Sequence, residues 1–298
     1  MLTGSPATTM PPRPRLPTSP STPISSLVPT SPAPYTLVWA SHARWPLPVD
    51  AGETQHGPAA RPLRISVLDS SFNPPTAAHQ ALASHGSDGF DAQLLALSVG
   101  NPDKGTIEQE VTAVRLEMMR QLGMDLHRRS GGKGGLSNVA VVLLQAPTFV
   151  RKSEILRNEL DKLVQAQAGS DEASVRLTFL VGWDTLIRIF APRYYQPPGP
   201  DLGSSMSAFL DRDDSSLACA RRGDIPSEEE DAFLNSDEVK EWVKRGKVEM
   251  FDIEERFRTI SSTEVRRAVK EERWEDVRRD VPIEGIIDVI KREGLYKD

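Results

Sequence analysis

Short apolar runs alternate with longer amphipathic stretches over most of the chain. The runs are rich in Val, Leu and Ile and are bounded by turn-forming residues, a pattern typical of buried strands. These predicted strands lie at 65–68, 94–99, 139–144, 175–181, 217–220 and 248–251. Because strands that alternate with helices are joined by right-handed crossovers, the pattern predicts an α/β fold with a doubly wound, Rossmann-like parallel sheet.

The stretches between the strands have apolar residues at helical spacing. The first predicted helix begins at Thr76, directly after Pro74 and Pro75, where missing N–H groups do no harm. Further helices are predicted at about 107–122, 153–167, 183–190 and 228–245. Two or three more follow from Ser262 onward, so the chain is expected to end in helices.

The first 60 residues differ from the rest in composition. Half of the 24 prolines precede Asp50, which is also the first acidic residue. Proline removes backbone donors and fixes φ, so residues 1–60 are predicted to form a largely disordered tail and residues 61–298 the folded domain. Within the tail, Tyr35–Trp39 is apolar enough for a short strand or for packing against the domain.

Two interruptions of the pattern are predicted to be flexible. The Pro/Gly/Ser-rich insertion at about 196–216 has the composition of a mobile surface loop. The glycine-rich segment 130–135 resembles a phosphate loop, but it lacks the Gly-Lys-Ser/Thr ending and precedes a strand. A connector is therefore the better interpretation of that segment.

Composition and charge exclude several classes of protein. No run of about 18 apolar residues occurs, which argues against a helical membrane span. The single cysteine, Cys219, excludes a disulfide scaffold and a cysteine-rich zinc module. The net charge of −6 argues against a nucleic-acid coat protein, which needs a positive surface to displace counterions. A local basic pocket for one small anion is compatible with this balance.

The location of the protein is an expectation from absent signals. The lack of acids before Asp50, together with Arg13, Arg15 and Arg44, has some likeness to a mitochondrial transit peptide. The prolines would break the amphipathic helix that such a peptide forms. A cytoplasmic or nuclear location is therefore the default, and a mitochondrial one is less expected.

Candidate chemistry follows the first predicted strand, where residues 71–79 read Ser-Phe-Asn-Pro-Pro-Thr-Ala-Ala-His. Ligands of open α/β sheets bind beyond the carboxyl ends of the strands, so this segment is well placed for one. Asn73 and the loop N–H groups can bind anions, and the N-terminus of the helix points to the same place. Thr76 and His79 share a helix face, so both can donate hydrogen bonds to phosphate oxygens.

A second candidate segment lies near the end of the chain, where residues 260–266 read Ile-Ser-Ser-Thr-Glu-Val-Arg. A capped helix start explains one hydroxyl and the Glu. Three consecutive hydroxyls with Arg266 one turn later also suit a polyphosphate. Both interpretations can hold together.

The two segments resemble those of the nucleotidylyltransferase superfamily, and most closely the nicotinamide mononucleotide adenylyltransferases of a divergent fungal branch. The resemblance covers about residues 64–296. Shorter matches lie between the two segments. Lys104 follows the second predicted strand, Gly182, Trp183 and Asp184 follow the fourth, and Arg221 follows the fifth.

The resemblance implies adenylyl transfer from ATP to nicotinamide mononucleotide, giving NAD and pyrophosphate. It assigns His79, with Arg266 and Lys104, to catalysis. It assigns the ATP to a larger set of residues: Ser71, Phe72, Asn73, Thr76, His79, Ser262, Thr263 and Arg266. Magnesium is expected to be carried by the nucleotide and water, since no carboxylate cage is visible.

The acceptor side departs from the family. Tryptophans that stack on nicotinamide in other members have no clear counterpart, so Phe149 or Trp183 is the candidate replacement, beside Gly182, Asp184 and Arg221. Ser70 stands where the family has glycine. Nicotinic acid mononucleotide or another acceptor stays open, as does a relative that only binds or hydrolyses ATP. A scaffold recruited through the Pro-rich tail has little support.

Overall fold

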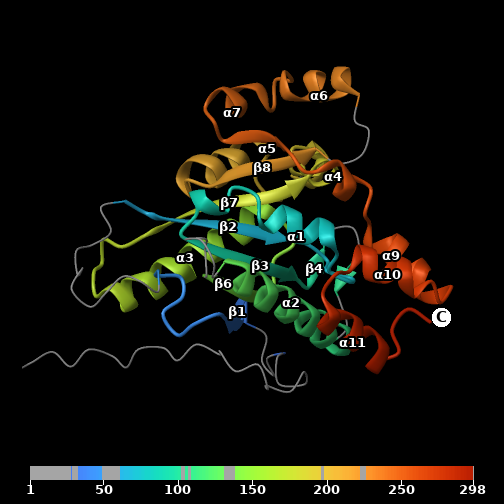
Figure 1. Cartoon of the computed structure of the whole chain (residues 1–298). Coiled ribbons are helices and arrows are strands. Elements are labelled where there is room, and N and C mark those ends of the chain that lie inside the picture. The colour runs from blue at the N-terminus through green and yellow to red at the C-terminus, as the bar shows by residue number, and fades with distance from the viewer. Residues whose placement is uncertain are drawn as a thin grey trace, which may run out of the picture.

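The computed structural model describes residues 28, 33–48, 61–101, 105–106, 109–130, 138–195, 198–221 and 226–297. Seven strands form one sheet in the order β1-β6-β3-β2-β7-β8-β9 (Figure 1). Their bounds are β1 Tyr35–Ala40, β2 Leu63–Asp69, β3 Ala92–Ser98, β6 Val139–Leu144, β7 Val175–Gly182, β8 Ser216–Arg221 and β9 Val248–Asp252. All neighbours are parallel except β1, which pairs antiparallel with β6 at the edge.

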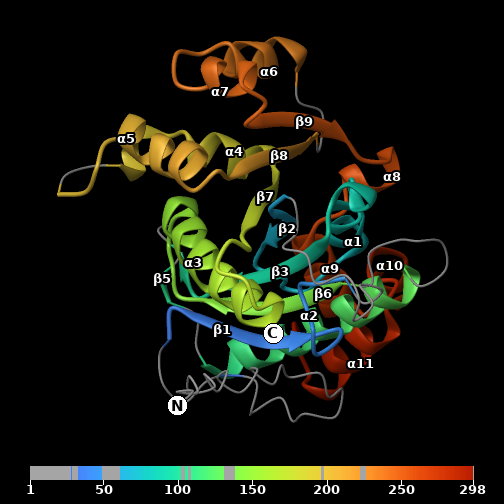
Figure 2. The same cartoon turned by 90° about the vertical axis from the view of Figure 1, so that its left-hand side faces the viewer.

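Helices cover both faces of the sheet (Figures 1 and 2). On one face, the core includes residues of α1, α2 and the C-terminal helices α9, α10 and α11. On the other face, it includes residues of α3, α4, α5 and the π-helical turn that follows α5. Their bounds are α1 Ala77–Ala83, α2 Gln109–Ser130, α3 Phe149–Ala168, α4 Trp183–Ile189, α5 Leu202–Met206, π-helix Ser207–Arg212, α9 Ser262–Lys270, α10 Trp274–Asp280 and α11 Glu284–Arg292.

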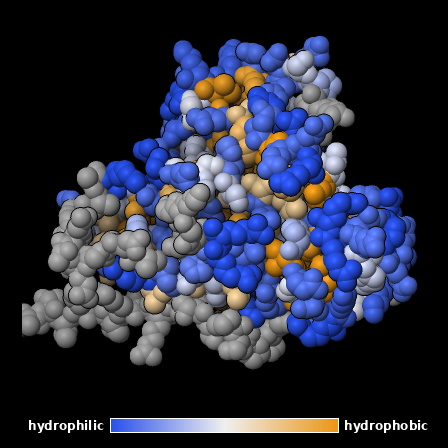
Figure 3. All heavy atoms as spheres, viewed as in Figure 1, coloured by the Kyte–Doolittle hydropathy of each residue, from blue (hydrophilic) through white to orange (hydrophobic). Residues whose placement is uncertain are grey.

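Smaller elements complete the described chain. They are the hairpin strands β4 Gly100–Asn101 and β5 Gly105–Thr106, the 3-10 turns Ser87–Gly89 and Pro192–Tyr194, and the helices α6 Ser227–Leu234, α7 Lys240–Lys244 and α8 Glu255–Arg258. Polar residues cover most of the face seen in Figure 3, and apolar residues reach it in separate patches. Within the described ranges, no helix is both long and apolar enough to cross a bilayer.

All six predicted strands are confirmed, and the apolar segment at Tyr35–Trp39 forms the edge strand β1. The folded domain therefore takes in residues N-terminal to position 61. Most of the predicted disordered tail lies outside the described residues, and so does the glycine-rich connector at 130–135 beyond Ser130, the last residue of α2.

Two predictions about the second half of the chain are wrong. Residues 202–212, predicted to lie in a mobile loop, are helical and bury Met206, Phe209 and Leu210. Those three residues have helical spacing, which the Pro/Gly/Ser-rich composition obscured. The single helix predicted at 228–245 is two helices, α6 and α7, with a turn between them that buries Val239 completely.

The parallel strands place their carboxyl ends at one edge of the sheet. The arrows of β2, β3 and β7 point toward the side of the molecule on which α9 lies (Figure 1). Each of these strands ends in a segment that carries predicted site residues. The fold therefore brings the predicted segments to the edge where ligands of such sheets bind.

Candidate nucleotide site

The loop between β2 and α1 is fixed from inside the protein. Phe72 is fully buried in the core although its φ is +44°, a left-handed conformation that costs a bulky residue energy. Its ring lies 5.1 Å from the imidazole of His79, centroid to centroid. Phe72 was predicted to bind ATP, and in this structure its side chain lies in the core. It anchors the loop and supports His79.

The imidazole of His79 is held at both ring nitrogens. The backbone N–H of Thr76 donates to Nδ1 at 3.1 Å, and the Thr76 hydroxyl lies 2.9 Å from the same atom. The hydroxyl of Ser70 lies 3.0 Å from Nε2. Because an N–H can only donate, Nδ1 must be an acceptor, which assigns the proton of the neutral ring to Nε2. Thr76 is itself buried, so its hydroxyl orients His79.

Helix α9 begins against this loop. Ser261 is its N-cap, with its hydroxyl accepting from the N–H of Glu264 at 3.2 Å. The Ser262 hydroxyl donates to the carbonyl of Pro74 at 2.8 Å, and Arg266 Nη1 donates to the carbonyl of Asn73 at 2.8 Å. Segments 188 and 193 residues apart are thus in direct contact. The fold thus brings the two predicted segments together into one candidate site.

Two guanidinium groups face the loop without a carboxylate partner among the described residues. Arg266 bonds only to the Asn73 carbonyl and, at 3.2 Å, to the exposed hydroxyl of Thr263. Arg115 of α2 donates to the Ser71 carbonyl at 3.4 Å. Burial, and then the nearby charge of Arg266, lower the pKa of Arg115. Two half-buried guanidinium groups whose partners are neutral are well suited to bind an anion.

The C-terminal segment closes the site on one side. The hydroxyl of Tyr296 donates to Asn73 Oδ1 at 2.8 Å. Burial raises the pKa of Tyr296 to about 12, although Arg115 and Arg266 act in the opposite direction. Neither Arg115 nor Tyr296 is among the site residues predicted from the sequence. Both stand in segments that resemble those of the family, but the pattern assigned neither of them a role in binding.

A second buried polar cluster lies at the carboxyl ends of β2 and β3. Asp69 pairs with the ammonium of Lys152 and accepts from the Ser98 hydroxyl at 2.8 Å. The Lys152 ammonium also lies 4.5 Å from the centroid of the Phe149 ring. The Phe149 and Phe179 rings form a T-shaped pair with their centroids 5.6 Å apart. One face of Phe149, a predicted acceptor residue, is thus occupied by a cation from its own chain.

The remaining predicted acceptor residues are placed differently from one another. Gly182 is the N-cap of α4 and Asp184 is exposed in its first turn. Trp183 is 6% exposed and forms a T-shaped pair with Phe233, so in this structure its ring is not open to an acceptor. Its ring faces the core because it is one of the apolar residues that seat α4 on the sheet.

Arg221 ends β8 and forms ion pairs with Glu230 and Asp252. The hydrogen bonds to Glu230 raise its pKa. These pairs join β8 to α6 and β9. Lys104 lies outside the described residues. Among the residues that are described, no group of three His, Cys, Asp or Glu side chains could hold a metal ion.

Comparison with known proteins finds similarity of the predicted kind. No family model matches the chain. Over 132 residues the chain is 33% identical to a Schizosaccharomyces pombe protein named "Putative nicotinamide mononucleotide adenylyltransferase". The match spans 44% of this chain and 44% of the relative, which is less than half the length of either.

Comparison with solved structures gives matches with TM-scores below 0.5. A Plasmodium falciparum nicotinic acid mononucleotide adenylyltransferase complexed with NaAD shares 16% identity and covers 78% of this chain and 97% of its own, with a TM-score of 0.49. The same enzyme complexed with APC gives a TM-score of 0.47 over the same shares. Thermotoga maritima TmcAL bound with alpha-thio ATP shares 14% identity over 78% of this chain and 55% of its own, with a TM-score of 0.38.

Proposed function

We propose that the protein is an adenylyltransferase that joins the adenylyl group of ATP to a pyridine mononucleotide, with nicotinamide mononucleotide as acceptor. One observation carries the proposal. The loop after β2 and the start of α9 are in direct contact. His79, Arg115 and Arg266 therefore lie around the same loop. The sequence similarity to the fission-yeast protein supports the same activity.

The reaction needs positioning more than acid–base chemistry. A phosphate oxygen of the mononucleotide attacks the α-phosphorus of ATP, and the new P–O bond forms as the bond to the bridging oxygen breaks. Pyrophosphate leaves with the electron pair. Because the nucleophile is already an anion, no general base and no covalent enzyme intermediate is required. Fixed cations and hydrogen-bond donors must offset the charge that develops on the leaving group.

The described residues divide the triphosphate between two sides. On the loop side, His79 faces the α- and β-phosphates, with Ser71 and Asn73 beside it. On the α9 side, Ser262, Thr263 and Arg266 hold the β- and γ-phosphates. The hydroxyl of Ser262 and the guanidinium of Arg266 would exchange a carbonyl partner for a phosphate oxygen. Arg115 adds a third cation to this set.

Two further groups belong to the proposal. Lys104 would assist from the segment after β3. Magnesium would arrive with ATP as part of the substrate, bridging phosphate oxygens and water.

The acceptor side favours a second candidate. Trp183 is buried, and the Lys152 ammonium covers a face of Phe149. Neither ring is free to stack on a pyridinium on both faces. These observations favour ATP hydrolysis without a pyridine acceptor as the second candidate. They do not separate nicotinamide mononucleotide from nicotinic acid mononucleotide, because both carry the same pyridinium ring.

One assay separates these candidates. Purified full-length protein is incubated with magnesium and ATP, alone and with each mononucleotide, and dinucleotide, ADP and pyrophosphate are measured. Dinucleotide formed in equal amount with pyrophosphate supports the proposed transfer, and the better acceptor identifies the substrate. ATP consumed at the same rate with and without acceptor, and no dinucleotide, contradicts it.

A further inference from the structure

Ser70 is the first residue after β2, and its position is fixed by the sheet. Its backbone N–H donates to the carbonyl of Ala96 in β3 at 3.3 Å. Its side chain is half-buried and points to His79, with Oγ 3.0 Å from Nε2. The proposed function makes no use of Ser70, which stands where the resembled family has glycine.

The direction of the Ser70–His79 hydrogen bond follows from the other side of the ring. The backbone N–H of Thr76 points at Nδ1, so that atom is unprotonated and the ring proton is on Nε2. Nε2–H therefore donates and Ser70 Oγ accepts. The hydroxyl hydrogen of Ser70 is then left to donate elsewhere, and no other side-chain hydrogen bond of Ser70 occurs among the described residues.

The hydroxyl hydrogen of Ser70 is free to bond to a ligand phosphate. Ser70 and His79 lie at the loop side of the nucleotide site, and the imidazole proton cannot reach a phosphate along the line that Ser70 Oγ occupies. A hydroxyl that accepts a hydrogen bond becomes a better donor, because bonded groups polarise one another. The imidazole thus strengthens the Ser70 hydroxyl as a donor, and the hydroxyl can donate a hydrogen bond to the ligand.

We propose that Ser70 is a substrate-contacting residue, whose hydroxyl accepts from His79 Nε2–H and donates to a phosphate oxygen of ATP. The proposal rests on the proposed function for the identity of the ligand. His79 then acts on the triphosphate through Ser70. No proton is transferred in the bound state, because each hydrogen bond keeps its donor and its acceptor.

The test compares two substitutions at this position. Ser70→Ala removes the donor and Ser70→Thr keeps it. A hydrogen bond to a charged group predicts that Ser70→Ala lowers kcat/KM for ATP by roughly 10- to 100-fold, with most of that activity retained in Ser70→Thr. Ser84→Ala, an exposed serine at the end of α1, is the matched control and is expected to equal wild type. Thermal unfolding shows that the variants compared are folded.

A double substitution distinguishes a joint role from two separate ones. If His79 acts through Ser70, then Ser70→Ala costs far less in a His79→Ala background than in wild type. Independent, multiplicative losses would contradict this arrangement. Unchanged kcat/KM in Ser70→Ala, or the same loss in Ser70→Thr as in Ser70→Ala, would overturn the proposal.

Failure of the proposed function can be recognised separately. Affinity for inorganic tripolyphosphate, measured by calorimetry, needs no turnover and no acceptor. If wild type makes no dinucleotide but binds tripolyphosphate more tightly than Ser70→Ala does, the adenylyl transfer fails and the Ser70 contact stands. Equal affinities of wild type and Ser70→Ala would reject the contact, whatever the reaction.

Discussion

The imidazole of His79 has one orientation in this structure because three neighbours share the task of fixing it. Thr76 satisfies Nδ1, Ser70 satisfies Nε2 and Phe72 supports the ring. Such restraint is what transition-state stabilisation requires, since a donor that must reorganise during the reaction loses much of its effect.

Replacing His79 tests its share of the reaction. His79→Ala is expected to lower kcat/KM for ATP by no more than Ser70→Ala does, roughly 10- to 100-fold, because His79 acts on the triphosphate through the Ser70 hydroxyl. Stability is expected to fall by only about 1–2 kcal/mol, the cost of a lost cap and a buried hydrogen bond. Steady-state kinetics and urea unfolding measure both. Gln80→Ala, next in sequence and bonded to Asp125 away from the site, is the control. Near wild-type turnover in His79→Ala would remove His79 from the mechanism.

Arg266 offers a neighbouring residue as its control. Arg266→Ala is expected to lower kcat/KM for ATP by about a hundredfold or more, because it removes a cation that has no carboxylate partner among the described residues. Arg267→Ala removes an exposed guanidinium that pairs with Glu264 and is expected to change kcat/KM little. Arg266→Lys should recover only part of the loss, since an ammonium cannot reproduce the two-sided contact. Equal effects of the Arg266 and Arg267 substitutions would rule out a specific phosphate contact.

Single residues show where sequence was sufficient and where it was not. His79, Ser262 and Arg266 could be proposed from the sequence because each stands in a short motif with chemistry of its own. Arg115 and Ser70 could not, because the contacts that they make depend on what the fold places opposite them. The burial of Trp183 could not be foreseen for the same reason, since the fold, and not residue type, decides whether a ring is left exposed to a ligand.

At the scale of elements, the start of α9 and the loop after β2 form a single unit, and the C-terminal segment holds it. Ser262 and Arg266 satisfy loop carbonyls, and Tyr296 satisfies the Asn73 side chain. The contact also positions α9, α10 and α11 on the sheet. The folded C-terminal segment is therefore part of the candidate nucleotide site.

Tyr296→Phe tests this closure. The variant loses the bond to Asn73, so we expect the free energy of unfolding to fall by about 1 kcal/mol near pH 8 and KM for ATP to rise several-fold. The pKa of Tyr296 is raised from 10.0 to about 12, so its contribution is complete below pH 10 and is lost as the pH rises toward 12. The stability difference between wild type and variant should disappear over that range in denaturant titrations.

Tyr195→Phe is the matched control for Tyr296→Phe. Tyr195 donates to the Ile189 carbonyl at 2.7 Å, and burial raises its pKa to about 12 as well. Its loss should reproduce the stability and alkaline effects without raising KM for ATP. A similar rise in KM from both substitutions would mean that Tyr296 acts only through general stability.

Elements were predictable where periodicity was clear. The strands were confirmed because apolar runs between turn residues have few alternatives. The helical segment 202–212 was missed because Gly203, Ser204 and Ser205 gave it the composition of a loop, although Met206, Phe209 and Leu210 lie on one buried face. Local composition was outweighed there by the apolar area that the segment buries.

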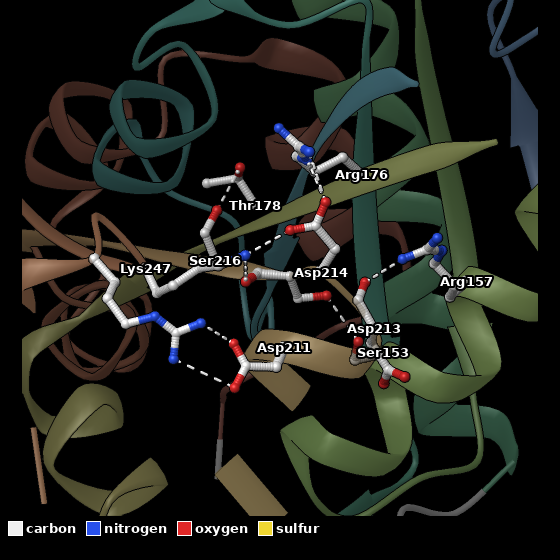
Figure 4. Close-up of polar contacts among 11 residues, drawn as sticks. Ser153, Arg157, Arg176, Thr178, Asp211, Asp213, Asp214, Ser216 and Lys247 are labelled. Carbon is white, nitrogen blue, oxygen red and sulfur yellow. Dashed lines mark hydrogen bonds and ion pairs between the residues drawn. The ribbon is translucent and has the colours of Figure 1, made fainter. Parts of the chain in front are cut away.

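At the scale of the whole molecule, the candidate nucleotide site and a network of ion pairs lie at opposite edges of the sheet. The candidate site lies at the carboxyl ends of the strands, and the ion pairs lie at the amino ends. The amino ends of β7, β8 and β9 carry a network of ion pairs far along the strands from the nucleotide site. Figure 4 shows the Asp214 carboxylate between the side chains of Arg176 and Lys247, with 2.7 and 2.6 Å contacts. Nearby, the hydroxyls of Ser153 and Ser215 share a hydrogen bond. This network joins α3, the π-helix and the sheet.

Asp214→Asn tests the contribution of the network. Burial acts against ionisation, but Lys247 and Arg176 together hold the pKa of Asp214 below its ordinary 3.8. Its stabilisation is therefore present above pH 3.8 and is lost as the pH falls below that value. We expect a loss of about 1 kcal/mol at pH 7 that shrinks in acid, with kcat unchanged. Asp237→Asn breaks a fully exposed pair and is expected to leave stability unchanged. A pH-independent loss in Asp214→Asn would contradict the ion-pair account.

The topology of the sheet was predictable as a class but not in its strand order. Alternating strands and helices imply a parallel sheet, yet nothing local says that β6 pairs with β1 and β3 while β7 pairs with β2. That order is what brings residues 70–79 beside α9. Only the family resemblance indicated this meeting in advance.

The most direct measurement is an experimental structure of the full chain with magnesium and a non-hydrolysable ATP analogue. The account predicts the triphosphate between Ser70 and His79 on one side and Thr263, Arg266 and Arg115 on the other. A nucleotide bound at another edge of the sheet, with the α9–loop contacts intact and no phosphate within hydrogen-bond distance of Arg266 or Ser70, would contradict it.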